Sequence, residues 1–427
     1  MNLAWLHCDN RENRASKRAE FMKIIDVAEF YAPRGGGVRT YIDLKLRAAR
    51  AHGHELVVLA PGARDHEEAH ASGRIIWVKS PKLPDPRYRL LVRERAVHAI
   101  LDREAPDLIE ASSPWTGAWI AARYRGKHGR TVHKSLVYHH DPVAVYPQTW
   151  LGARFGAERV DSWCGGYWRY LQRLSSHFDL TLVSGAWLAR RLAQHGVKNT
   201  KAVAFGVDTR LFTAASPDPA LRQELLQRAG APAHAKLLVT VSRLHPEKRL
   251  GTLMAAVAQL VRTQPVALVV YGDGPFADHY RKRARGLPVY FAGLTRDRAQ
   301  LARALASSDA LLHGSSAETF GLVVAEALCA GLPIVVPDAG GALEFVGEGY
   351  AESYRAGDAE GCAHAAVRLL QRDRELLRAL SKQASDTRVL SHHQHWGRLF
   401  ESYAALINTG EKAHRAHTSF AFSSESA

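Results

Sequence analysis

Two successive series of short apolar runs, each run followed by a stretch with helical periodicity, constrain the fold of this chain more than any other feature. The first series begins at Met22 with KIIDVAEFY and continues with ELVVLAPG. The second begins near residue 235 with AKLLVTVSR and continues with VALVVYGDG. Continuous apolar strands that alternate with helices are typical of parallel sheets covered on both faces. The pattern predicts an α/β fold with two Rossmann-like domains in tandem.

The segment FTAASPDP, which starts at Phe212, separates the two series and is rich in proline and small residues, as linkers are. After the second series, an amphipathic pattern predicts a terminal helix; it consists of Trp396, Leu399, Phe400, Tyr403 and Leu406. The predicted organisation is a flexible extension (1–21), an N-terminal domain (22–211), a C-terminal domain (212–390), a last helix (391–410) and a disordered tail (411–427).

The chain is strongly basic, with 57 Lys+Arg against 42 Asp+Glu and a formal charge of +15. Residues 1–210 hold 33 basic and 21 acidic residues, so +12 of this excess lies in the first half and +3 in the second. The first half is therefore expected to meet an anionic partner, either nucleic acid, acidic lipid or a phosphorylated substrate. The four cysteines form no CxxC pair, and no apolar run approaches the ~20 residues of a membrane span, which together favour a cytoplasmic protein.

The most informative motif runs from Glu318 to Glu326 (ETFGLVVAE), after an apolar run and at the start of a predicted helix. Ligands of doubly wound sheets bind at the carboxyl ends of the strands, which is where this motif lies. Gly321 and its neighbours would present backbone N–H groups to a phosphate. The two carboxylates can accept hydrogen bonds from sugar or ribose hydroxyls. A capped helix with two surface acids is the alternative that the motif alone leaves open.

Arg243 and Lys248 lie five residues apart in SRLHPEKR, at the end of the predicted strand KLLVTV. A guanidinium and an ammonium group across a proline turn can together neutralise a diphosphate, although exposed loop cations are common. Two glycine-rich turns can bring the backbone close to a phosphate, or can be ordinary turns. These turns contain Gly272 and Gly274 in one case, and Gly35, Gly36 and Gly37 in the other.

His139 and His140 end the predicted strand SLVY. Adjacent strand residues point to opposite faces, so only one of them should face a ligand, to whose hydroxyl it can donate. No cysteine stands nearby, and we expect no zinc site here. The histidines of the segment HHQH (392–395) are expected to cap or pack at the start of the last helix, rather than to bind a metal.

Read in order, these motifs resemble those of the retaining nucleotide-sugar glycosyltransferases of family 4, which have the GT-B fold. The resemblance extends from Lys23 to about Leu406 and includes VPDAGG at 336–341, followed by Glu344. It implies two Rossmann-like domains that face each other across a cleft, with the last helix crossing back to the N-terminal domain. It also implies metal-independent transfer, with retention, of a hexosyl group from a UDP- or GDP-sugar to a glycan, lipid-linked saccharide or glycolipid. No tightly bound cofactor is expected.

The resemblance also implies a role for each candidate residue. Arg243 and Lys248 would bind the donor diphosphate, and Glu326 the ribose hydroxyls. Glu318 would bind the transferred sugar, and His140 would contact it near the reacting carbon, or His139 would if the register shifts by one. Backbone contacts with sugar and phosphate would come from Thr319, Phe320, Gly321, Leu322, Gly272, Gly274, Gly36 and Gly37. The loop GGGVRTY departs from the family pattern, because it has no second downstream glycine and no histidine.

Two other functions remain open from the sequence, a sugar-nucleotide epimerase of the same fold and a basic nucleic-acid-binding protein. The first would need further acid–base residues, and the second lacks a known motif or a basic stretch interleaved with aromatics. We therefore expect no nucleic-acid partner. The segment 150–170 mixes Trp150, Trp163 and Trp168 with arginines. That mixture suits peripheral contact with the inner, anionic face of a membrane. A buried aromatic face of two helices is the interpretation that we slightly favour.

Overall fold

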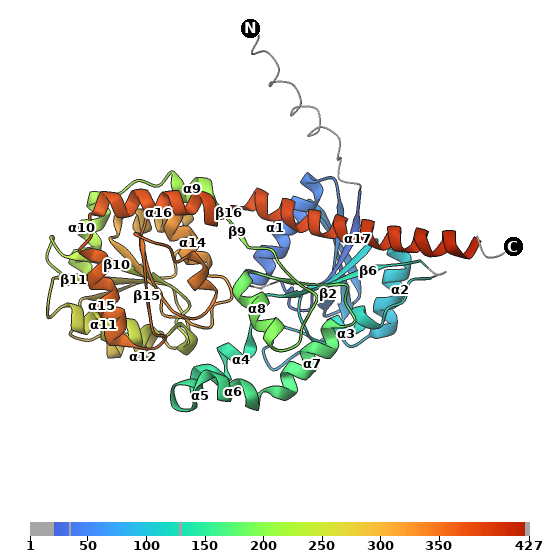
Figure 1. Ribbon diagram of the computed structural model, residues 1–427, viewed down its shortest axis with the longest axis horizontal. Helices are drawn as coiled ribbons and strands as arrows, with labels where there is room; N and C mark the ends of the chain where they lie inside the picture. The colour runs from blue at the N-terminus through green and yellow to red at the C-terminus, as the bar shows by residue number, and fades with distance from the viewer. Residues whose placement is uncertain (1–20, 34–35, 128–129, 423–427) are drawn as a thin grey trace, which may run out of the picture. The chain divides into compact units, whose positions relative to one another are not determined.

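The computed structural model of the chain describes residues 21–33, 36–127 and 130–422, with side chains of the last helix described to residue 409. It contains two large sheets with helices packed on them (Figure 1). The predicted extension, apart from residue 21, and Gly35 of the glycine-rich turn lie outside the described residues. The predicted α/β class with parallel sheets is confirmed.

The first sheet has eight strands in the order β3-β4-β2-β1-β5-β6-β7-β8. Its central pairings are parallel, and β3 pairs antiparallel with β4. The strands are β1 (Lys23–Val27), β2 (Glu55–Gly62), β3 (His66–His70), β4 (Gly73–Lys79), β5 (Leu108–Ala111), β6 (His133–Tyr138), β7 (Leu180–Val183) and β8 (Thr200–Ala202).

The second sheet has six parallel strands in the order β12-β11-β10-β13-β14-β15. They are β10 (Lys236–Val241), β11 (Val266–Tyr271), β12 (Val289–Gly293), β13 (Ala310–Leu312), β14 (Ile334–Pro337) and β15 (Ala351–Tyr354). Alternate residues of β10 enter two different apolar clusters, with Leu237 in one and Leu238 in the other. Burial on both faces explains why these strands read as continuous apolar runs. A further short pair is formed by β9 (Gly206–Val207) and β16 (Leu390–Ser391).

The helices of the first half are α1 (Gly37–Ala51), α2 (Glu94–Glu104), α3 (Thr116–Arg123), α4 (Pro142–Val145), α5 (Pro147–Phe155), α6 (Ala157–Trp163), α7 (Gly165–Ser175) and α8 (Ala186–Gln194). Those of the second half are α9 (Thr209–Thr213), α10 (Pro219–Arg228), α11 (Leu250–Leu260), α12 (Ala277–Arg283), α13 (Arg298–Ser307), α14 (Leu322–Cys329), α15 (Ala359–Leu370), α16 (Arg374–Arg388) and α17 (His392–Phe422), with the 3₁₀ turns η2 (Pro246–Lys248) and η3 (Gly341–Phe345).

The chain forms two compact units. Unit 1 takes its described residues from 1–137, 174–181 and 396–427, and unit 2 consists of 138–173 and 182–395. The predicted ranges 22–211 and 212–390 stay a prediction about domains. Asp218, inside the predicted linker, caps α10 by accepting a hydrogen bond from the Leu221 N–H at 3.0 Å. The last helix, α17, continues beyond residue 410, where we predicted its end.

The start of the last helix packs within unit 1, as expected of a segment that returns to the first domain. The Trp396 ring lies 5.0 Å from that of Tyr41 on α1, and the Phe400 ring lies 5.0 Å from that of His54. Tyr403 is fully buried and donates a hydrogen bond to Glu110 on β5. Glu110 in turn lies 2.5 Å from Nζ of the fully buried Lys45 on α1. A buried charged network thus joins the first and the last helix of unit 1.

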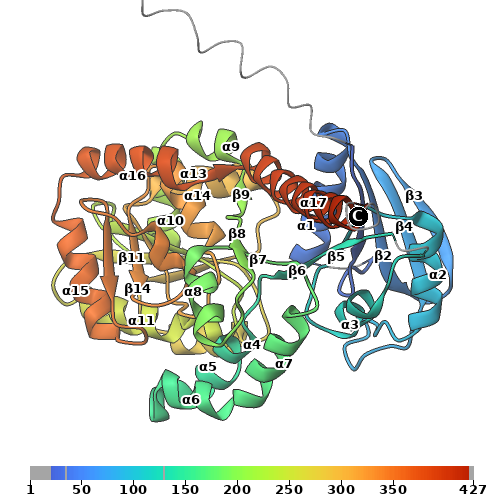
Figure 2. The same ribbon diagram turned by 45° about the vertical axis from the view of Figure 1, so that its right-hand side comes forward.

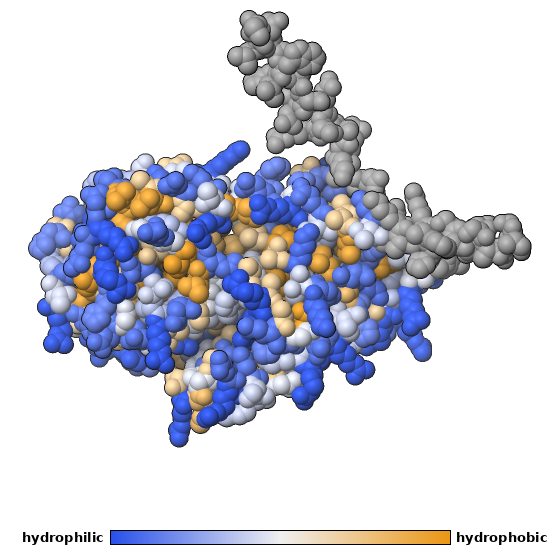
Figure 3. All heavy atoms as spheres, in the orientation of Figure 1, coloured by the Kyte–Doolittle hydropathy of each residue, from blue (hydrophilic) through white to orange (hydrophobic). Residues whose placement is uncertain are grey.

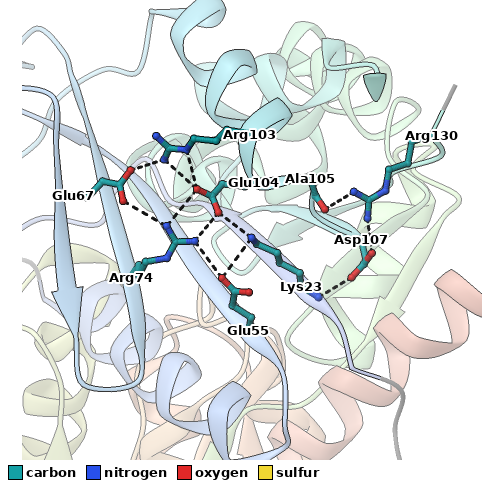
Figure 4. A network of polar contacts seen from close by, with 9 residues as sticks. All are labelled: Lys23, Glu55, Glu67, Arg74, Arg103, Glu104, Ala105, Asp107 and Arg130. Atoms are coloured by element: carbon teal, nitrogen blue, oxygen red, sulfur yellow. Dashed lines mark hydrogen bonds and ion pairs between the residues drawn. The ribbon is translucent and has the colours of Figure 1, made fainter. Parts of the chain in front are cut away.

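A second polar network covers the amino-terminal ends of β1 and β2 in unit 1 (Figure 4). Glu104 lies at its centre, with Oε2 2.6 Å from Arg74 Nη2 and 3.0 Å from Lys23 Nζ. Burial raises the pKa of Glu104, but Arg74, Lys23 and Arg103 lower it more, to about 2. The network is completed by Glu55, Glu67, Arg103, Ala105, Asp107 and Arg130.

Candidate active site

Two loops of unit 2 bring together a cation and a carboxylate at the carboxyl ends of neighbouring strands. Lys248 ends the turn after β10, and Glu318 lies in the loop between β13 and α14. Lys248 Nζ donates a hydrogen bond to Glu318 Oε2 at 2.6 Å, and both side chains are about one-fifth to one-quarter exposed. Burial raises the pKa of Glu318, but Lys248 and His313 lower it by more, so that the pKa lies below its usual value. The two predicted donor-binding residues therefore form one ion pair.

Arg243 follows the end of β10 in the same loop and is exposed. Among the described residues it makes no hydrogen bond or ion pair that would neutralise its guanidinium. An exposed arginine without a carboxylate partner, beside a paired lysine, leaves positive charge available for an anionic ligand.

Gly272 and Gly274 hold the loop after β11 tightly against the loop that carries Arg243. The φ angle of Gly272 is 126°, and a Cβ atom there would lie 1.9 Å from the Ser242 carbonyl oxygen. A Cβ atom at Gly274 would lie 2.6 Å from the Leu244 carbonyl oxygen. These glycines are therefore required for the close approach of two backbones, whether or not a ligand is bound.

The segment from Thr319 to Leu322 leads into α14. Gly321, with φ of 98°, precedes the first turn, and Leu322 begins the helix with its side chain exposed. A Cβ atom at Gly341 would lie 2.4 Å from the Thr319 carbonyl carbon, so the loop after β14 packs directly on this segment. Phe320 is buried, with its ring 5.2 Å from that of Phe345. The backbone of residues 319–322 is thus fixed by packing against Gly341 and Phe345.

Glu326 lies on α14 and is buried, with its carboxylate paired to Arg298 at the start of α13. Burial raises the pKa of Glu326, and Arg298 opposes this shift only in part. The sequence analysis did not name Arg298, because a single arginine at a helix start gives no sign of its partner.

The two adjacent histidines that follow β6 have different surroundings. The His139 ring packs edge-to-face on Phe205 at 4.5 Å, and its carbonyl oxygen accepts a hydrogen bond from Thr319 Oγ1 at 2.8 Å. His140 is exposed at the surface, and charges on Glu247, Lys248 and Glu318 act on its imidazole. Desolvation lowers the pKa of His140, and these carboxylates and Asp141 compensate only in part. Of the two histidines, His140 is the one on which the charges of Lys248 and Glu318 act.

His313 is a further candidate that the sequence analysis did not single out. It follows β13, it is 4% exposed, and its Nε2 has no hydrogen-bond partner among the described residues. Desolvation lowers its pKa to about 4, so the ring is neutral at physiological pH. Its position at a strand end, five residues before Glu318, was the available signal in the sequence.

Gly36 and Gly37 lie in unit 1, where Gly37 begins α1. A Cβ atom at either position would meet no atom within 4 Å. Packing within the described structure therefore does not require glycine here, in contrast to Gly272 and Gly274.

Comparison with known proteins identifies the family of this chain. A family model described as Glycosyltransferase Family 4 matches residues 35–211, and one described as Glycosyl transferases group 1 matches 235–372. A GDP-mannose-dependent alpha-mannosyltransferase of Mycobacterium tuberculosis is 30% identical over 342 residues, which cover 76% of this chain and 81% of that protein. The chain belongs to glycosyltransferase family 4.

Other relatives of this family 4 glycosyltransferase include an enzyme named for a phosphatidylinositol mannoside and a plant sulfoquinovosyl transferase. A GDP-mannose-dependent alpha-(1-6)-phosphatidylinositol dimannoside mannosyltransferase of M. tuberculosis is 29% identical over 327 residues, covering 76% of this chain and 82% of that one. The sulfoquinovosyl transferase SQD2 of Arabidopsis thaliana is 29% identical over 357 residues, covering 80% and 65%.

Solved structures show that this glycosyltransferase has the GT-B fold. Anabaena HepE, in complex with UDP and glucose, superposes with a TM-score of 0.63 at 21% identity, covering 90% of this chain and 99% of that one. Sucrose-phosphate synthase of Thermosynechococcus elongatus gives 0.66 at 18%, covering 93% and 100%. Within the described part of this family 4 chain, no helix combines the length and apolarity that a bilayer crossing requires.

Proposed function

We propose that this glycosyltransferase moves a mannosyl group from GDP-mannose to a hydroxyl of a glycolipid, with retention of configuration and without a metal. The observation that carries the proposal is the Lys248–Glu318 ion pair, whose charges act on His140. The relatives named as GDP-mannose-dependent mannosyltransferases support the choice of donor. They also favour GDP over UDP, which the sequence motifs did not distinguish.

In this proposal each group of the site has one task. Lys248 leaves Glu318 and, together with Arg243, neutralises the donor diphosphate, while Glu318 accepts hydrogen bonds from the mannose hydroxyls. Glu326 binds the ribose, and His140 lies near the reacting carbon. The backbone N–H groups that contact the nucleotide-sugar donor belong to Thr319, Phe320, Gly321, Leu322, Gly272, Gly274, Gly36 and Gly37.

Retention follows if the acceptor attacks from the face that the diphosphate leaves. The glycosidic C–O bond to the diphosphate breaks, an oxocarbenium-like sugar forms, and the acceptor oxygen bonds to the same carbon. The departing diphosphate takes the acceptor proton. Positive charge fixed at the leaving group, from Arg243 and Lys248, then supplies the main stabilisation of the transition state.

The acceptor is proposed to be a glycolipid in the inner, anionic face of a membrane, on which the enzyme sits peripherally from the cytoplasm. The relatives named for phosphatidylinositol mannosides support a lipid acceptor, and so does the +12 excess of the first half. We propose no nucleic-acid partner. The two family matches lie on either side of the segment after Phe212, which supports the predicted division into an acceptor domain and a donor domain.

Three measurements test the proposal. A thermal-shift screen against GDP, UDP and ADP should show stabilisation by GDP above the other two. Radiolabelled GDP-mannose should then yield a labelled lipid only when a phosphatidylinositol mannoside is added, with and without EDTA, and NMR should show an α-linkage. Conversion of the donor to an epimer without acceptor would instead identify an epimerase, and a β-linkage would exclude retention.

A further inference from the structure

The hairpin of α5 and α6 exposes an aromatic ridge that the rest of unit 2 does not cover. Tyr146, Trp150 and Trp163 are 54%, 61% and 55% exposed, and Leu151 is 39% exposed. No residue of α5 is buried. Figures 1 and 2 both show the hairpin beyond α4 and α8, with no other element of unit 2 on its outer side. Of the interpretations drawn from the sequence, the buried aromatic face is therefore wrong for Trp150 and Trp163, although Trp168 on α7 is buried.

Exposed cations accompany the ridge. Arg154, Arg159 and Arg169 are exposed, whereas Glu158 is the one exposed acidic residue between Tyr146 and Tyr170. The remaining acid of the hairpin, Asp161, is paired with both terminal nitrogens of Arg191 at 2.9 Å. Figure 3 shows hydrophilic residues adjoining pale and hydrophobic ones at the lower edge, where Figure 1 places α5 and α6.

The hairpin is rigidly connected to the strand end that carries His140. Asp141, the next residue, is fully buried and accepts hydrogen bonds from the N–H groups of Val143 and Ala144 at 3.0 Å, which caps α4. Arg191 pairs with Asp141 as well as with Asp161 at the end of the hairpin. The same guanidinium thus holds the hairpin and the histidine segment in one arrangement.

We propose that the α5–α6 hairpin is the surface through which this enzyme docks on an anionic lipid bilayer, which places His140 beside the membrane that carries the acceptor. The chemistry of the ridge indicates a lipid bilayer as its binding partner. Tryptophan and tyrosine prefer the boundary between headgroups and acyl chains, because one part of each ring system is apolar and another forms hydrogen bonds. Arginines beside such aromatics attract anionic headgroups. The inference rests on the proposed glycolipid acceptor, and it names the partner surface.

The test compares the full chain with three double variants in sedimentation with vesicles of equimolar phosphatidylcholine and phosphatidylglycerol. The first carries Trp150→Ala and Trp163→Ala. The matched control, Val261→Ala with Leu376→Ala, removes two exposed apolar side chains elsewhere in unit 2. The wild-type and control proteins should sediment alike, and the tryptophan variant should partition at least about tenfold more weakly, because it lacks the two indole rings that would be buried at the membrane interface. Arg154→Glu with Arg159→Glu should weaken binding to these vesicles more than to pure phosphatidylcholine.

Equal sedimentation of the wild type and the tryptophan variant, or no sedimentation of the wild type, would overturn the inference. So would light scattering that shows a dimer in the wild type and a monomer in the tryptophan variant with unchanged vesicle binding, because a second copy would then cover the ridge. Mannosyl transfer to a deacylated, water-soluble acceptor separates this inference from the proposed function. The tryptophan variant should retain that transfer and lose transfer to acceptor in vesicles. If the wild type binds vesicles but transfers to neither acceptor, the proposed function fails and the docking surface stands.

Discussion

Lys248 and Glu318 neutralise each other across 2.6 Å, although 70 residues of chain separate them. A donor that carries both a diphosphate and a sugar would supply each of them with a new partner, a phosphate oxygen for the ammonium group and a hydroxyl for the carboxylate. Each charge is therefore paired with the other until a bound donor replaces its partner. Replacing either residue should therefore impair activity while the protein still folds.

We expect Lys248→Ala and Arg243→Ala each to lower kcat by at least about 100-fold, because preorganised charge at a leaving group is worth two to three orders of magnitude. Lys282→Ala, an exposed lysine on α12, is the matched control and should leave kcat unchanged. Steady-state mannosyl transfer measures the effect, with circular dichroism to show that each variant is folded. Nearly normal turnover in both site variants would remove the basis of the proposed mechanism.

Glu326→Ala should raise the KM for the donor by about tenfold and change kcat much less, because a ribose contact is made equally in the ground and transition states. Glu375→Ala, an exposed acid on α16, serves as the control. Kinetics at varied donor concentration separate the two parameters. A fall in kcat with unchanged KM would show that Glu326 acts on the reacting sugar instead.

Gly272→Ala should destabilise the chain more than Gly286→Ala. Both glycines have positive φ, 126° and 80°, so alanine is strained at either position by about 1 kcal/mol or more. Only at position 272 would the new Cβ atom also collide with a backbone oxygen, that of Ser242. The midpoint of thermal unfolding measures the difference, which should exceed several degrees. Equal shifts would show that the loop after β11 moves freely away from the loop after β10.

Lys45→Met should lower the free energy of unfolding by about 3–5 kcal/mol, because it leaves Asp26 and Glu110 buried without a counter-charge. Tyr403→Phe removes only one hydrogen bond to Glu110 and should cost about 1 kcal/mol. Urea unfolding followed by fluorescence compares the two. A larger effect of Tyr403→Phe than of Lys45→Met would contradict a charge-based role of the network.

Acid should weaken the network of Figure 4 through Glu104. Its pKa in the folded state is about 2, against 4.5 for the free group, so the folded state binds fewer protons in that interval. Its stabilising effect is complete above pH 4.5 and is lost as the pH falls toward 2. The loss should be on the order of 2 kcal/mol, because Arg74 is partly exposed and its field is screened. Urea midpoints in a buffer series should fall less steeply for Glu104→Gln, and parallel curves would refute the assignment.

The strands that were predictable from the sequence are those buried on both faces, such as β10 and β11. The hairpin strand β3 was not, because its sequence HEEAH is exposed and carries no apolar run. At the site, the order of motifs placed Lys248 and Glu318 at neighbouring strand ends, where the structure pairs them. The two ion pairs could not be predicted from the sequence, because nothing near Lys248 indicates that it pairs with Glu318, and nothing near Glu326 indicates that it pairs with Arg298. Lys45 was missed for a related reason: a lysine in a helical pattern normally lies in solvent.

The position of α17 in the chain has a consequence for synthesis on the ribosome. Lys45 and Glu110 are made early, but Tyr403, which closes their network, comes after every residue of unit 2. Residues 182–395 can therefore pack while unit 1 still lacks its last helix. The nascent first unit must wait, with His54 and Tyr41 uncovered, until Trp396 and Phe400 emerge. Nascent-chain arrest before residue 396 should leave this half of the protein sensitive to protease after the other half has become resistant.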